Sequence, residues 1–148
     1  MIRSATAIWK GSLAAGEGSV STSSGVISNA LYSFGSSTGN EPCTSPSEML
    51  AAAIASCMSL IITQELVKLG VRTTFVKTES ELTLEEHQGH WQITGIQLHA
   101  STSLPERDAK TFQQACRTAK TKCPISRVLS VPIKLTAGLQ PELHATAA

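Results

Sequence analysis

This sequence of 148 residues has little net charge, and that lack argues against two classes of partner. Charged residues make up 16% of the chain, and the formal net charge is +1. Nucleic acids and anionic membranes are bound largely through clustered positive charge, so we expect neither as a partner. The first residues, MIRSATAIWKG, contain no long apolar stretch, so we expect no signal peptide and a cytoplasmic location.

The sequence also lacks the close ligand pairs that bind structural zinc. It has four cysteines but no CxxC motif. His87 and His90 lie on either side of an expected turn, and His99 and His144 stand alone. Structural zinc sites usually take tight ligand pairs, so we expect no metal and no other cofactor. A cytosolic chain of this size can bury a sufficient hydrophobic core without disulfide bonds, so we expect no structural disulfide framework.

The composition is that of one globular domain, which we expect to span residues 1–148. Apolar residues make up 41% of the chain, and no internal repeat divides it. Two strands are expected at Thr6–Trp9 and Gly18–Thr22, and Val26–Ile27 could begin a third. The stretch Ser33–Ser45 is rich in glycine, serine and threonine, which predicts a loop.

A long apolar segment, Leu50–Leu69, carries Cys57 near its centre. A capping box over Ser45–Glu48 predicts the start of a helix, and Gly70 predicts its end. Polar residues interrupt the segment, which favours a buried central helix over a membrane span.

The second half of the sequence predicts a hairpin, two helices and a last strand, with a turn at Gln88-Gly89 and a bulge at Gly95. The expected elements are, in order, strands at Thr73–Leu84 and Trp91–Leu98, helices at Asp108–Lys122 and Pro124–Leu129, and a strand at Val131–Leu135. Strands and helices in this order predict an α+β fold rather than a βαβ repeat.

The residues around Cys57 leave its role open. Periodicity alone favours a small buried apolar side chain, which is where free cysteines commonly occur. Burial raises the pKa of a thiol, and the helix dipole acts mainly on the first turn, about three turns before Cys57. A reactive Cys57 would therefore need a cation from another segment, and the candidates are Arg3, Lys10 and Arg127.

Cys123 directly precedes Pro124, which ends one helix and could open the next. If it does, Cys123 is the N-cap of the second helix, where backbone N–H groups favour a thiolate. The alternative is a plain residue at a helix junction. By these residues alone Cys123 is the better activated of the two thiols. Cys116 is expected in the core, and Cys43 is either incidental or an extra redox-active thiol.

Three segments together carry a family pattern: AIWKGSLAAGEGSVSTSSGV, YSFGSSTGNEPCTSPSEMLAAAIASC and KTKCPISRVL. They resemble the osmotically inducible protein C / organic hydroperoxide resistance (OsmC/Ohr) family, and its OsmC branch more closely, from about Ala5 to Leu135. The resemblance implies an α+β fold with antiparallel sheets, a long buried central helix and an intertwined homodimer. It also implies an active site near the dimer interface.

The resemblance further implies a thiol peroxidase that reduces organic hydroperoxides or hydrogen peroxide. Cys57 matches the peroxidatic position, whose sulfur attacks the O–O bond and becomes a sulfenic acid. Cys123 matches the resolving position, which condenses with that sulfenic acid to a disulfide. A dithiol reductant, which the sequence does not identify, then resets the pair.

The chain departs from the family at the two residues that activate the peroxidatic thiol. Relatives of the OsmC branch use an Arg paired with a Glu, and these positions are Ser37 and Ser47 here. Glu48 is not expected to substitute, because it precedes Cys57 by nine residues and lies on the opposite helix face. The alternative function is therefore a catalytically weak redox-sensing or small-ligand-binding protein on the same scaffold.

Overall fold

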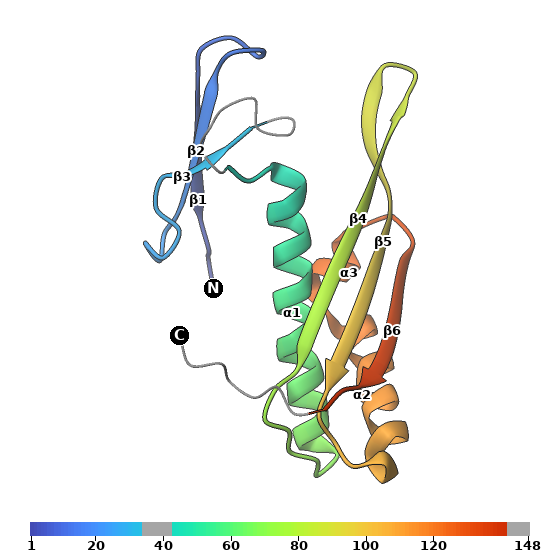
Figure 1. Cartoon of the computed structure of the whole chain (residues 1–148). Helices are drawn as coiled ribbons and strands as arrows, with labels where there is room; N and C mark the ends of the chain where they lie inside the picture. Colours follow the sequence, from blue (N-terminus) through green and yellow to red (C-terminus); the bar gives the residue numbers. More distant parts are fainter. Residues whose placement is uncertain (34–42, 142–148) are drawn as a thin grey trace. The chain divides into compact units, whose positions relative to one another are not determined.

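The computed structural model describes residues 1–33 and 43–141, in two compact units, Met1–Leu50 and Ala51–Ala148 (Figure 1). Ser37 and His144 lie outside the described residues. The single domain expected for residues 1–148 stays a prediction.

The first unit is a small antiparallel sheet in the order β1-β2-β3. Its strands are β1 (Ala5–Lys10), β2 (Glu17–Thr22) and β3 (Ala30–Tyr32), so the first two predicted strands are confirmed. The third strand was wrongly expected at Val26–Ile27. There the chain turns, with a positive φ at Gly25, and Val26 is 88% exposed.

Helix α1 (Pro46–Lys68) begins and ends where the sequence predicts. At its start Ser45 Oγ accepts from the Glu48 N–H at 3.2 Å, and the Glu48 carboxylate accepts from the Ser45 N–H at 3.1 Å. At its end Gly70 has a φ of +76°, and the Val71 N–H donates to the Leu66 carbonyl at 2.9 Å. These bonds form a capping box and a Schellman motif, which satisfy backbone groups at both ends.

The second unit contains a sheet in the order β4-β5-β6. Its strands are β4 (Lys77–His87), β5 (His90–Thr102) and β6 (Ile133–Leu139). A two-residue turn with positive φ at Gln88 and Gly89 joins β4 to β5, as predicted. Thr83 pairs with Gly95 and Leu84 with Ile93, so the extra residue of the bulge is next to Gly95.

The β4–β5–β6 sheet is mixed, which differs from the expected antiparallel sheets. β4 and β5 are antiparallel, but β6 pairs with β5 in parallel. The chain leaves β5 through a 3-10 turn η1 (Glu106–Asp108) and the helices α2 (Ala109–Lys122) and α3 (Pro124–Val128). Such a helical crossover returns the chain to the same end of the sheet, so the next strand runs parallel.

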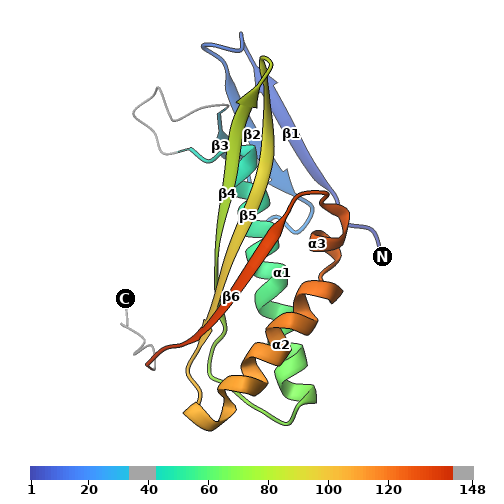
Figure 2. The ribbon, with the colours of Figure 1, turned by 90° about the vertical axis from the view of Figure 1, so that its right-hand side faces the viewer.

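Helices α1 and α2 lie on the same side of this sheet (Figure 2). Their apolar stripes and β5 share one core, whose fully buried members include Ile54, Met58, Ile62, Leu66, Ile96, Leu98, Phe112 and Ala119. In the single chain α1 is buried on one face only, since Leu60 is 73% and Val67 60% exposed. By length and hydropathy alone α1 could also cross a membrane, but its buried stripe belongs to this core.

Candidate active site

The fold brings Cys57 and Cys123 together, although 66 residues separate them in the sequence. Cys57 is on α1, where it packs against the core, and Cys123 is buried between α2 and α3. Their sulfur atoms are 3.1 Å apart, and the Cys123 thiol donates a hydrogen bond to the Cys57 sulfur. A disulfide bond is about 2.0 Å long, so a movement of about 1 Å would allow the two sulfurs to bond.

Cys123 is the N-cap of α3, as the Cys-Pro sequence predicts. Pro124 occupies the first helical position, and the Cys123 sulfur accepts from the Ser126 N–H at 3.5 Å. The Cys123 N–H donates to the Ala119 carbonyl at 2.9 Å, so the residue also completes α2. Both neighbouring helices therefore hold this thiol in place.

The surroundings shift the two thiol pKa values in opposite directions. Burial, and then the contact with Cys123, raises the pKa of Cys57 to about 11. Burial also acts to raise the pKa of Cys123, but hydrogen bonds from Ser126, Cys57 and Ile125 outweigh it and lower that pKa overall. Cys123 is therefore the first of the pair to lose its proton, in agreement with the sequence-based expectation.

A reactive Cys57 would need a nearby cation, and none contributes to its pKa among the described residues of its own unit. Burial, Cys123 and the Ile125 backbone account for the shift. Arg127 is exposed on α3, and Arg3 and Lys10 belong to the other unit. The half-buried Cys57 thiol thus has a raised pKa, and within the described part of its unit no charged side chain offsets the effect of burial.

The two serines that replace the activating pair of the family lie in different situations. Ser37 is outside the described residues. Ser47 is in the first turn of α1, with its hydroxyl oxygen 3.0 Å from that of Ser45. The neighbouring Glu48 accepts from the Thr44 hydroxyl at 3.0 Å as well as from the Ser45 N–H. These bonds confirm its capping role.

The other two cysteines are separate from this pair. Cys116 is buried in the core as predicted, and burial raises its pKa to about 12. Cys43 is half-buried in the first unit, with its sulfur 3.4 Å from the Ser33 hydroxyl. Within residues 1–33 and 43–141, no group of three or more His, Cys, Asp or Glu side chains could hold a metal ion.

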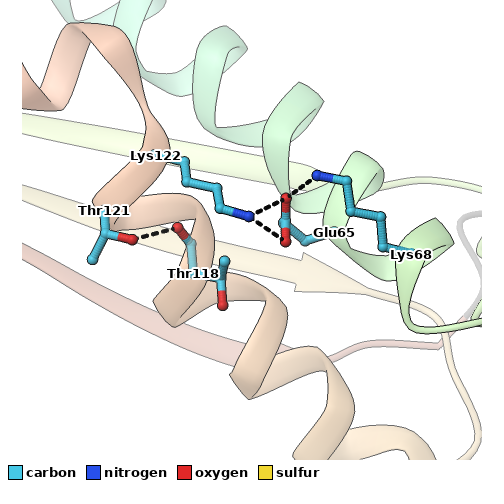
Figure 3. A network of polar contacts seen from close by, with 5 residues as sticks. All are labelled: Glu65, Lys68, Thr118, Thr121 and Lys122. Carbon is cyan, nitrogen blue, oxygen red and sulfur yellow. Dashed lines mark hydrogen bonds and ion pairs between the residues drawn. The ribbon is translucent and has the colours of Figure 1, made fainter.

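An ion cluster close to Cys123 in the sequence was not expected (Figure 3). Glu65 on α1 accepts from Lys68 at 2.7 Å, and Lys122 donates to both of its carboxylate oxygens at 3.0 Å. Lys68 and then Lys122 lower the pKa of Glu65. The signal in the sequence was a carboxylate inside an apolar helix, which calls for a cationic partner.

Comparisons with known proteins agree with this fold. A family model described as "OsmC-like protein" matches residues 38–137. The curated "Peroxiredoxin OsmC" of Escherichia coli (strain K12) is 35% identical over 127 residues, which cover 86% of this chain and 89% of that protein. The same values hold for the protein of that name from Shigella flexneri.

Solved structures with the same fold share less sequence. The organic hydroperoxide resistance protein OhrB of Bacillus subtilis is 20% identical, with a TM-score of 0.72 and coverage of 91% of this chain and 98% of that one. An OsmC-like protein of unknown function from Vibrio cholerae is 17% identical, with a TM-score of 0.75 and coverage of 93% and 99%.

Proposed function

Because the chain belongs to the OsmC family, we propose that it is a thiol peroxidase that reduces organic hydroperoxides and hydrogen peroxide through Cys57 and Cys123. The observation that carries the proposal is the 3.1 Å separation of the two sulfurs. The names of the relatives, peroxiredoxin and organic hydroperoxide resistance protein, support the same chemistry.

Exposure and ionisation divide the roles between the two thiols. Cys123 is fully buried whereas Cys57 is partly exposed, so a peroxide would reach Cys57 first. When Cys123 has lost its own proton, its sulfur is within hydrogen-bond distance of the Cys57 thiol and can take the Cys57 proton. The Cys57 sulfur then attacks one peroxide oxygen, the O–O bond breaks, and the other oxygen leaves as alcohol or water once it gains a proton.

The second half of the cycle uses the same contact. The Cys123 sulfur attacks the Cys57 sulfenic acid, the S–O bond breaks, and the oxygen leaves as water while the Cys57–Cys123 disulfide forms. A dithiol reductant returns two electrons and two protons and restores both thiols.

A catalytically weak redox sensor or small-ligand-binding protein is the second candidate, and the raised pKa of Cys57 favours it. With a pKa of about 11, about one Cys57 in ten thousand is ionised at pH 7. A free thiol of pKa 9.0 would be ionised about a hundred times more often. Turnover should therefore be slow unless a cation approaches Cys57.

We also propose that the protein is a cytoplasmic homodimer of a single OsmC-like domain, with the thiol pair near the interface. The exposed side chains of Leu60 and Val67 on α1 support a partner, because a helix this apolar is seldom left half uncovered.

The test is a thiol titration before and after one equivalent of cumene hydroperoxide. Wild type should lose two thiols, with the Cys57–Cys123 disulfide mapped by mass spectrometry. Cys57→Ser should lose none rapidly, whereas Cys43→Ser, the control, should still lose two. Unchanged thiols in wild type would reject the peroxidase and favour the second candidate.

A further inference from the structure

Glu65 is a charged side chain in an apolar setting. It lies on the buried stripe of α1 between Ile62 and Leu66, and its side chain is 8% exposed. Removing a carboxylate from water is costly unless cations and hydrogen bonds replace the lost solvation. Lys68 and Lys122 provide them, so all three charges form one cluster (Figure 3).

The two lysines do different things in this cluster. Lys68 follows Glu65 by three residues on the same helix, so its 2.7 Å contact lies within α1 and does not connect α1 to another element. Lys122 is the last residue of α2, and its Nζ lies 3.0 Å from both Glu65 oxygens. Lys122 therefore ties the end of α2 to α1.

The residue that follows Lys122 is Cys123. The end of α2 thus contacts α1 at two points, through the Cys123 sulfur at Cys57 and through Lys122 at Glu65. Cys57 and Glu65 are eight residues apart, which is about 12 Å along the helix. Two points at this spacing restrict both the position and the rotation of the segment that carries Cys123.

We propose that Glu65 and Lys122 are positioning residues that hold Cys123 against Cys57 for disulfide formation. This inference rests on the proposed function of the thiol pair. Helix ends fray, and a frayed end of α2 would move Cys123 away from its partner. Disulfide formation between two thiols depends on the fraction of time that their sulfurs lie close enough to bond. The ion pair between Glu65 and Lys122 raises this fraction.

The matched variants are Lys122→Met and Lys68→Met. Each removes one cation from Glu65 and keeps a long apolar stem, but only the first cuts the link between the helices. Both lysines are about half exposed, so neither change should prevent folding, which circular dichroism would confirm. Lys122→Arg keeps the charge and should restore the link.

The measurement is the equilibrium of the Cys57–Cys123 disulfide in dithiothreitol redox buffers, which gives the effective concentration of one thiol at the other. We expect Lys122→Met to lower this effective concentration about threefold to tenfold. Lys68→Met should leave it within about twofold of the wild-type value, and Lys122→Arg should match wild type. An equal drop in both methionine variants, or none in Lys122→Met, would overturn the positioning role.

The redox buffer contains no peroxide, so the inference and the proposed function can fail separately. Suppose that wild type forms the disulfide in the buffer and that Lys122→Met lowers the effective concentration, but that wild type does not react with cumene hydroperoxide. This result would refute the peroxidase and support the positioning role. A wild type that forms no disulfide under either condition would refute both.

Discussion

Replacing Cys123 with alanine should make Cys57 more reactive toward alkylation, even though it removes the proposed resolving thiol. The pKa of Cys57 is raised to about 11 by burial first and then by its contact with Cys123. The contact raises it first through the hydrogen bond that the Cys57 thiol donates to an ionised Cys123, and then because that thiolate repels a second negative charge at 3.1 Å. Cys123→Ala removes both the hydrogen bond and the charge and leaves burial in place.

The size of the effect has an upper limit. A fall in the Cys57 pKa from about 11 to the ordinary 9.0 would raise the thiolate fraction at pH 8 about a hundredfold. Burial is the largest cause and remains, so we expect an increase of about tenfold. Reactivity should rise with pH in both proteins, with the variant reaching its plateau at lower pH, because only the thiolate is alkylated.

The assay is the rate of iodoacetamide modification of the Cys57 peptide between pH 7 and 11, followed by mass spectrometry. Cys116→Ala is the control, since it removes another core cysteine that does not contribute to the pKa of Cys57. Equal rates in Cys123→Ala and wild type, with both proteins folded, would refute the claim that Cys123 raises the pKa of Cys57.

Two further predictions concern stability. Gly18→Ala should destabilise the first unit by about 1–3 kcal/mol in urea unfolding, because a Cβ at this position would lie 2.5 Å from the Tyr32 ring. An unchanged urea midpoint of unfolding would contradict this close packing. The lowered pKa of Glu65 means that its ionised form stabilises the fold above pH 4.5 and that this contribution is lost as the pH falls further. Wild type should therefore lose its advantage over Glu65→Gln in thermal melts below about pH 4.5, and a constant difference from pH 7 to pH 3 would argue against the ion cluster.

Local signals in the sequence predicted most elements. The capping box at Ser45 and Glu48, the stop at Gly70 and the turn at Gln88-Gly89 each depend on a few neighbouring residues, and all were found. The parallel pairing of β6 was missed, because it depends on how α2 and α3 return the chain to the sheet. No short segment contains that information.

The same distinction holds at the site. Cys123 as an N-cap followed from the adjacent Pro124, but its contact with Cys57 was expected only from the family resemblance. The ion pair of Glu65 with Lys122 was missed, since 57 residues separate the two and only the folded chain brings them together. The buried carboxylate required a cation without indicating which one.

The parallel pairing of β6 also sets an order of events while the chain is being synthesised. β5 is the middle strand of its sheet, and its second neighbour is made only after both helices of the crossover. Until then the nascent chain carries a thirteen-residue strand with one open edge. Open edges of long strands pair readily with other chains. Production of this protein is therefore most vulnerable to aggregation in the interval between the synthesis of β5 and the docking of β6.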